Sequence, residues 1–279
     1  MQKLSISALY ETARNVRLEV IKMIYEARSG HTAGSLSSTD IICALYFKIM
    51  THDPSRPDWE DRDRFILSNG HVCPALYAAM ALSGYYDISL LKKNRSLGSP
   101  LQGHPVRKML PGIETTSGPL GEGLGQAVGI ALAARMDDKR FRIYCLSSDG
   151  EHDEGSHWEA VETAAKYQLS NLSLFVDRNR IQLSGFTRDI MPLEPLTDKY
   201  RSFGWNVIGI DGHNMEEIVK AVDMARIEYE KPSVVIANTV AGKGVSFMED
   251  NWEWHGRAPN EEEMRKALRE LKRGNKDAE

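Results

Sequence analysis

The sequence predicts a three-layer α/β/α fold in which helices cover both faces of a mostly parallel central sheet. Two observations support this prediction. Short apolar segments with the character of buried strands alternate with longer helical segments along most of the 279 residues. The strand segments are apolar throughout, as is typical of parallel strands covered on both faces. Because no internal repeat or low-complexity linker interrupts the pattern, we expect one α/β domain over residues 1–259 and a charged C-terminal helix and tail over residues 260–279.

The expected helices and strands follow one another in order. An N-terminal helix is predicted because apolar residues recur on one helical face before Gly30 ends the run, namely Leu9, Ala13, Val16, Val20, Met23 and Ile24. A glycine-rich helix is predicted over 119–136, and its glycines indicate that a cofactor or another helix approaches the backbone closely. Buried strands are predicted at 142–148, 172–177, 205–210 and 232–239, with further helices at 151–167 and 215–229.

The composition is that of a soluble globular enzyme. A net charge of −4 gives no electrostatic argument for nucleic acid or an anionic membrane as the main partner. The sequence has no apolar run of membrane-spanning length, and charged residues interrupt the N-terminal segment where a signal peptide would need a continuous apolar core. The three cysteines lie among apolar neighbours and are expected to be buried free thiols, which favours a cytoplasmic protein.

An Asp-Gly pair and an Asn follow two successive predicted strands. Asp149 comes after the strand at 142–148, and Asn179 comes after the strand at 172–177. Because ligands bind outside the carboxyl ends of parallel strands, these two side chains are expected to meet there. A carboxylate, an amide oxygen and a nearby backbone carbonyl are hard ligands that suit Mg²⁺ or Ca²⁺ and suit zinc poorly. The alternative is that Asp149 only caps the following helix.

Histidines form the second pattern. Five of the eight histidines adjoin a glycine, namely His31, His71, His104, His213 and His255. Such a pair places an imidazole on a flexible turn where it can face a ligand. For any one of them taken alone, a solvated or core histidine is the more common case. As a set, they fit a site that is built from several loops.

Several motifs, in order, resemble those of transketolase. They are Asp61-Arg-Asp-Arg-Phe-Ile-Leu-Ser-Asn-Gly-His71, Gln102-Gly-His-Pro105, Glu114-Thr-Thr-Ser-Gly-Pro-Leu-Gly121 and Ala241-Gly-Lys-Gly-Val-Ser-Phe-Met-Glu249. The segment from Asp149 to Asn179 resembles the thiamine diphosphate fingerprint, with Ser148 in place of its usual first glycine. The resemblance covers nearly the whole chain and is to the diphosphate-binding half of transketolase, without its pyrimidine-binding and C-terminal domains.

Two further segments are similar to the N-terminal subunits of transketolases that are split into two chains. One is Trp254-His-Gly-Arg-Ala-Pro-Asn260. The other is His31-Thr-Ala-Gly-Ser35, which replaces the His-Pro-Gly run usual in single-chain enzymes.

The resemblance implies thiamine diphosphate as the cofactor, held through Mg²⁺ or Ca²⁺. The metal would be bound by Asp149, Asn179 and the backbone carbonyl of Ile181. The other implied cofactor contacts are His71 and His255 at the diphosphate, Gly150 beside it, Gly118 and Leu120 at the aminopyrimidine ring, and Glu154 and Glu159 near the cofactors and the subunit interface. The implied catalytic residues, which would bind the sugar's oxygens near the reacting carbon, are His31, His104 and His255.

The resemblance also implies the reaction and the partner. The activity would be transfer of a two-carbon ketol unit from a ketose, by default a phosphorylated sugar, to an aldose. The glutamate that activates the cofactor belongs, in transketolase, to the pyrimidine domain across a subunit interface. We therefore expect this chain to be inactive alone and to work with a separate C-terminal subunit in an α2β2 heterotetramer.

The sequence also allows other functions. The chain is compatible with a non-catalytic cofactor-binding or scaffold subunit, or with half of a deoxyxylulose-phosphate-synthase-like enzyme. A nucleotide-binding Rossmann protein is disfavoured because no glycine fingerprint follows the first strand. A zinc hydrolase would use His152, Asp153 and His157, but a spacing of five residues is expected to turn the two imidazoles away from a common helical face.

Overall fold

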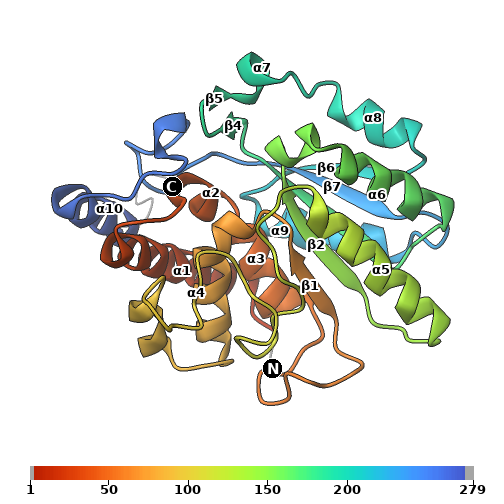
Figure 1. The fold of residues 1–279 in the computed structure, drawn as a ribbon, viewed down its shortest axis with the longest axis horizontal. Helices are drawn as coiled ribbons and strands as arrows, with labels where there is room; N and C mark the ends of the chain where they lie inside the picture. Colours follow the sequence, from red (N-terminus) through yellow and green to blue (C-terminus); the bar gives the residue numbers. More distant parts are fainter. Residues whose placement is uncertain (1–2, 274–279) are drawn as a thin grey trace.

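A five-stranded parallel sheet forms the centre of the protein (Figure 1). The computed structural model describes residues 3–273. The strand order is β1-β2-β3-β7-β6, and all four pairings are parallel. The strands are β1 (Arg64–Leu67), β2 (Ile143–Ser148), β3 (Leu172–Arg178), β6 (Asn206–Asp211) and β7 (Ser233–Asn238). The predicted parallel sheet is confirmed, and only the short edge strand β1 was not predicted.

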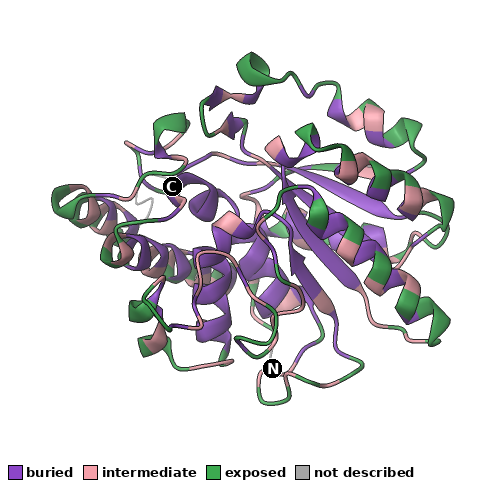
Figure 2. Cartoon of the chain, in the orientation of Figure 1, coloured by how far each residue is buried: buried purple, intermediate pink, exposed green. Residues whose placement is uncertain are grey.

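Helices cover both faces of this sheet, as predicted. One face carries α1 (Ile6–Ala27), α3 (Thr39–Ala44), α4 (Cys73–Ser83) and α9 (Met215–Arg226). The other face carries α5 (Glu122–Met136), α6 (Gly155–Lys166) and α8 (Leu196–Ser202). In Figure 2 the strands are buried, whereas the outer faces of α5 and α6 are exposed.

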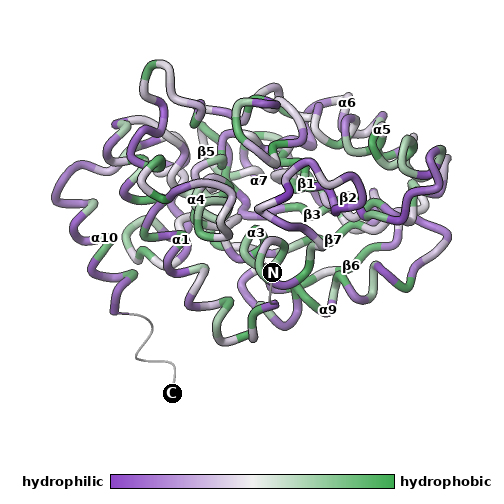
Figure 3. The backbone as a smooth tube through the Cα atoms, turned by 90° about the horizontal axis from the view of Figure 1, so that it is seen from below, coloured by the Kyte–Doolittle hydropathy of each residue, from purple (hydrophilic) through white to green (hydrophobic). Residues whose placement is uncertain are grey.

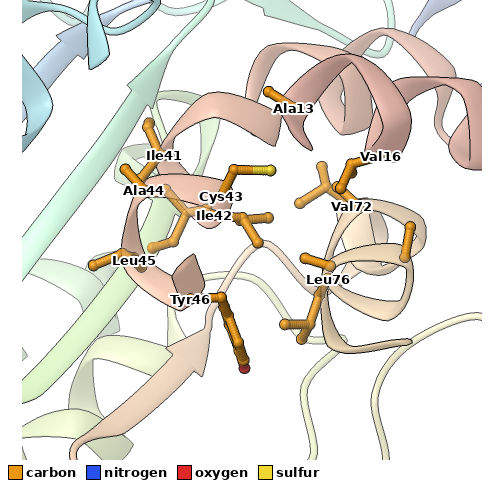
Figure 4. Packing of buried hydrophobic residues seen from close by; sticks show 14 of the residues in the cluster. Ala13, Val16, Ile41, Ile42, Cys43, Ala44, Leu45, Tyr46, Val72 and Leu76 are labelled. Carbon is orange, nitrogen blue, oxygen red and sulfur yellow. The ribbon is translucent and has the colours of Figure 1, made fainter. Parts of the chain in front are cut away.

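Alternate residues of the central strands contribute to two separate apolar cores. Tyr144 and Leu146 of β2 pack with the helices of the first face, whereas Ile143 and Cys145 pack with those of the second. The period of two in a strand sends successive side chains to opposite faces, so a strand covered on both sides must be apolar throughout. Figure 4 shows part of the first core, where Ile42 and Cys43 of α3 face α1 and α4. Figure 3 shows that hydrophilic residues lie mainly on the outer segments.

The remaining elements are short, apart from α10. They are α2 (Thr32–Ser37), η1 (Leu45–Ile49), η2 (Gly70–Val72), η3 (Ile88–Lys93), η4 (Gly150–Asp153), β4 (Ile181–Gln182), β5 (Gly185–Phe186), α7 (Thr187–Ile190), η5 (Trp252–Trp254) and α10 (Glu261–Arg273). The charged helix expected after residue 259 is α10, which packs on α1 through buried Ala267 and Leu271. The tail expected after it lies outside the described residues. No helix within residues 3–273 is long and apolar enough to cross a bilayer.

Two predicted helices begin later than expected. The glycine-rich helix starts at Glu122, not at 119, because Gly121 adopts a left-handed conformation with φ 81° that ends the preceding loop. The predicted helix over 151–167 is a 3₁₀ turn, η4, followed by α6. The two are separated by Glu154, whose extended backbone (φ −87°, ψ 128°) breaks the helix. Both breaks lie beside the expected cofactor site and shape its loops.

Two glycines of α5 should respond in opposite ways to the same substitution. A Cβ atom on Gly123 would lie 2.5 Å from Ser68 Cα, whereas one on Gly125 would meet no atom within 4 Å. We expect Gly123→Ala to lower the free energy of unfolding by about 1–3 kcal/mol through overpacking. Gly125→Ala should raise it by up to about 1 kcal/mol, because alanine favours the helix. Urea denaturation of the two variants checks this, and equal effects of the two substitutions would contradict it.

Candidate active site

The predicted metal ligands lie together where β2 and β3 end. Asp149 Oδ1 accepts a hydrogen bond from Gly150 N at 2.9 Å, and its Oδ2 accepts one from Arg180 N at 2.7 Å. Asn179 Oδ1 accepts from Ile181 N at 3.2 Å. The parallel register pairs Ser148 with Asp177, which brings the two loops to the same edge. Asp149 does bond the first amide of η4, as the capping alternative supposed, but its second oxygen joins the loop that contains Asn179.

Asp177 is a buried residue of this site to which the sequence analysis gave no role. Its carboxylate accepts hydrogen bonds from the hydroxyls of Ser37, Ser38 and Thr239, at 2.7 and 2.6 Å for the two serines. Asn179 Nδ2 donates to Ser37 Oγ at 3.2 Å, so this hydroxyl cluster orients the Asn179 amide. An acidic residue at the end of a predicted strand was the only signal for it.

Burial and the neighbouring Asp177 charge raise the pKa of Asp149 to about 7. A divalent cation at this position would offset the two carboxylate charges. Within residues 3–273, no three His, Cys, Asp or Glu side chains converge as a metal cluster, so a metal here would also need amide and backbone oxygens. The donor set of Asp149, Asn179 and Ile181 meets that need and fits Mg²⁺.

Three of the five glycine-linked histidines form one cluster. The ring centroids of His31 and His71 are 4.8 Å apart, those of His31 and His255 are 5.4 Å apart, and those of His71 and His255 are 5.6 Å apart. His31 precedes α2, His71 lies in η2, and His255 follows η5. Residues far apart in the sequence thus meet at one point, as the pattern predicted.

His104 lies beside this cluster, and His213 does not. A Cβ atom on Gly118 would be 3.7 Å from His104 Cγ, so the His104 loop packs on the loop that carries Gly118. His213 instead has a structural role: its Nδ1 bonds Asp40 Oδ2 at 2.7 Å, and its Nε2 accepts from Val240 N at 2.8 Å.

The clustered imidazoles are neutral at physiological pH. Burial lowers the pKa of His31 to about 4, with smaller contributions from His255, Arg95 and His104. Burial likewise lowers the pKa of His71 and of His255. Nδ1 of His31 and of His255 is buried without a hydrogen-bond partner among the described residues. A neutral imidazole offers one donor and one acceptor, which suits the hydroxyl and carbonyl oxygens of a sugar.

Arg95 joins the loops of two of these histidines. Its Nη1 donates to Ser29 Oγ at 2.7 Å, and its Nη2 donates to Gly103 O at 3.3 Å. Arg95 has a left-handed backbone, with φ 57°. The sequence carried no signal for this residue, because an arginine in a polar loop is ordinary.

The loop from Ser117 to Gly121 forms another wall of the site. A Cβ atom on Gly70 would lie 2.4 Å from Ser117 Oγ, so this loop packs directly on the turn that carries His71. Leu120 is 37% exposed, in keeping with a side chain that meets a ligand or partner. Glu154 and Glu159 are exposed on the outer side of η4 and α6, and their roles near the cofactor stay predictions.

A cleft of ≈ 540 Å³ opens beside Asp149 and Asn179. Arg178, Arg180 and Arg188 line it together with the two expected metal ligands. Its size is that of a small-molecule site. Glu194 and Asp250 also line it, and Arg178 forms an ion pair with Glu194, so the three arginines do not make the cleft cationic.

The expected separation of His152 and His157 is wrong. Their ring centroids are 4.1 Å apart, because the break at Glu154 folds η4 back onto α6. Both Nε2 atoms, however, bond the hydroxyl of Tyr200 at 2.8 Å, so the pair is a buried structural network. Asp153 lies apart from it and accepts a hydrogen bond from Gln182. The geometry therefore does not support a zinc site.

The His152 imidazole should make stability depend on pH. Burial lowers its pKa to about 4 from 6.5, so the unfolded chain binds a proton between these values and the folded protein does not. This residue's stabilising contribution is therefore present above pH 6.5 and is lost as the pH falls toward 4. His152→Gln should lose less stability than the wild type over that range. Urea unfolding at several pH values measures this, and parallel curves for the two proteins would contradict it.

Comparison with known proteins defines the class of this chain. Residues 9–276 match the family profile described as transketolase, thiamine diphosphate binding domain. The chain is 44% identical to the 6-deoxy-6-sulfo-D-fructose transketolase subunit SqwG of Clostridium sp. (strain MSTE9), over 95% of this chain and 96% of that protein. It is 40% identical to an apulose-4-phosphate transketolase subunit of Phocaeicola vulgatus, over 91% and 90%. Human transketolase is 38% identical over 90% of this chain, but only 40% of the human protein is covered.

Solved structures agree with the sequence comparisons. The transketolase of Campylobacter jejuni superposes with a TM-score of 0.91 at 35% identity, over 96% of this chain and 43% of that one. The Pichia stipitis transketolase in complex with sedoheptulose 7-phosphate superposes with a TM-score of 0.89 at 33% identity, over 95% and 41%. The fold is that of the thiamine diphosphate-binding domain of transketolases. The chain belongs to the transketolase family and corresponds in extent to relatives that are named as transketolase subunits.

Proposed function

We propose that this chain is the N-terminal subunit of a two-chain transketolase that moves a two-carbon ketol unit from a ketose to an aldose. One observation carries the proposal: the clustered histidines and the Asp149–Asn179 pair occupy one edge of a domain that spans only about two fifths of single-chain transketolases. The same chain spans nearly the full length of relatives that are named as transketolase subunits. The rest of the active site would therefore come from a separate chain.

Different residues of this chain would bind different parts of the cofactor. Asp149, Asn179 and the Ile181 carbonyl would bind Mg²⁺, and the metal would neutralise the diphosphate. His71 and His255 would donate to the remaining diphosphate oxygens, and Gly150 would leave room beside them. Bound thiamine diphosphate would supply the electron sink on which a ketose carbon–carbon bond is broken and remade. Gly118 and Leu120 would contact its aminopyrimidine ring.

The other imidazoles would act on the sugar. His31 and His104, with His255, would hold the oxygens next to the reacting carbon and exchange protons with them. Neutral rings suit this role because each one can both accept and donate a proton.

The partner would be a C-terminal subunit that carries the pyrimidine-binding domain. Large apolar side chains are exposed on loops of this chain, among them Leu97, Met109, Leu120, Leu183 and Met191. Apolar side chains that gather into an exposed patch mark protein interfaces, so these residues are the first candidates for the contact with the partner. We propose an α2β2 heterotetramer that works in the cytoplasm, in agreement with three buried free cysteines.

The donor would be a ketose with an anionic terminal group. Two relatives are named for a sulfonated ketose and for a ketose phosphate. Phosphorylated and sulfonated ketoses are therefore the first donors to screen.

Reconstitution tests the proposal. The chain is purified, its partner is recovered by affinity capture from native extract in the presence of thiamine diphosphate and Mg²⁺, and each is assayed alone and together with a panel of ketose donors. We expect turnover only from the pair. Turnover by the isolated chain would overturn the split-enzyme proposal. A stable pair that binds cofactor but accepts no ketose would favour the scaffold alternative.

A further inference from the structure

Glu151 is a buried carboxylate in a place where a charge is costly. Its exposed fraction is 0%, and it forms no ion pair with any Lys, Arg or His of residues 3–273. An apolar side chain of similar volume would fill the space without a desolvation penalty. The position therefore calls for an explanation beyond packing.

Three hydrogen bonds offset the burial of this carboxylate. Oε1 accepts from Ser68 Oγ at 2.6 Å and from Gly121 N at 3.0 Å. Oε2 accepts from Ser148 N at 2.9 Å. All three donors point at a carboxylate, so both of its oxygens are used and the side chain is held in one orientation.

Each donor belongs to a different loop of the candidate active site. Ser68 begins the turn that carries His71. Gly121 ends the loop that carries Gly118 and Leu120. Ser148 directly precedes Asp149. One side chain therefore joins the three loops that would hold the diphosphate, the aminopyrimidine ring and the metal.

The loops around Glu151 have little room to shift independently. A Cβ atom on Gly70 would lie 2.4 Å from Ser117 Oγ, and one on Gly121 would lie 2.6 Å from Glu154 Cβ. Close packing of this kind transmits a displacement of one loop to its neighbours. Because Glu151 bonds all three loops, it sets the distances between the cofactor-binding groups on those loops, and a single ligand must span these distances.

We propose that Glu151 is the positioning residue of the cofactor site: it touches neither cofactor nor substrate, but fixes the His71, Gly118 and Asp149 loops at the spacing that thiamine diphosphate with Mg²⁺ requires. The inference rests on the proposed function. It also explains why a carboxylate without an ion-pair partner lies beneath the site. Only a side chain with two acceptor oxygens can accept hydrogen bonds from donors in three directions.

Glu151→Gln tests the proposal with the shape of the side chain preserved. One oxygen can still accept from Ser68 and Gly121, but the new amide group faces Ser148 N, donor against donor. We expect the dissociation constant for thiamine diphosphate, measured by calorimetry with Mg²⁺ on the assembled two-chain protein, to rise by about 10- to 100-fold, as for the loss of an outer-shell partner. Ser68→Ala removes a single bond and should raise it by a smaller factor. Glu162→Gln, the same change on the exposed side of α6, is the matched control and should bind as the wild type.

A second measurement separates positioning from general stability. The melting temperature of each variant is taken without cofactor, and binding is measured well below it. A purely structural role would lower the melting temperature and leave the dissociation constant of the folded protein unchanged, which overturns the inference. Should Glu151→Gln not fold, Ser68→Ala alone decides, and wild-type affinity in that variant overturns the inference. If the wild type itself binds no thiamine diphosphate, the proposed function fails, and the inference fails with it.

Discussion

Asp149→Asn is expected to weaken cofactor binding severely without unfolding the protein. Asp149 is the only carboxylate among the three expected metal ligands, so the substitution removes the one negative charge that the metal would contact. We expect the affinity for thiamine diphosphate with Mg²⁺ to fall by at least about 100-fold, more than for an outer-shell change. Calorimetry of the assembled protein measures the loss.

The same variant should keep its stability, because it relieves a repulsion in the cofactor-free protein. Asp149 is buried beside Asp177, and both of its oxygens only accept backbone hydrogen bonds. We expect the free energy of unfolding without metal to stay within about 1 kcal/mol of the wild type, since loss of repulsion opposes loss of one hydrogen bond. Asp153→Asn is the matched control on the exposed side of η4. Cofactor affinity equal to the wild type in Asp149→Asn would remove this residue from the metal site.

His31→Asn is expected to lower kcat/KM of the two-chain enzyme for its ketose by about 100- to 10,000-fold, the range for loss of a proton-transferring group. Cofactor affinity should change little, because the diphosphate contacts are assigned to His71 and His255. Steady-state kinetics over a series of donor concentrations, with cofactor saturating, measures the effect.

His213→Asn is the control for that prediction. His213 also follows a glycine, but its ring is taken up by Asp40 and Val240 N, away from the cluster. Its loss should reduce stability and leave kcat/KM nearly unchanged. If the two variants lose kcat/KM equally, His31 has no specific role in the reaction.

Part of the candidate site could be predicted from sequence motifs and their spacing. The Asp-Gly and Asn signals follow predicted strands, and parallel strands end at one edge, so the meeting of Asp149 and Asn179 followed from local sequence. The pairing of an imidazole with glycine marked five histidines, and the structure brings His31, His71 and His255 together with His104 beside them. The same pattern also marked His213, because a Gly-His step does not reveal which partner the ring will meet.

The residues that support the site were not predictable in this way. Glu151, Asp177 and Arg95 each bond groups that are distant in the sequence, such as Ser68, Ser37 and Ser29. The break at Glu154 was missed for a related reason. Gly155 was a local sign of an interruption, but the extended backbone of Glu154 lies where its side chain packs close to Gly121, a residue 33 positions earlier in the chain.

The sequence by itself determined the layered α/β class, the succession of β2, β3, β6 and β7 along the chain, the edge of the sheet that carries the chemistry, and the family. These properties depend on hydrophobic period and on motifs of adjacent residues, which are local. The tertiary structure alone decided which histidines share a site, where the helices beside it break, and which buried carboxylates hold its loops in place. Those properties depend on contacts across tens to hundreds of residues, and such contacts exist only once the sheet has brought its carboxyl ends together.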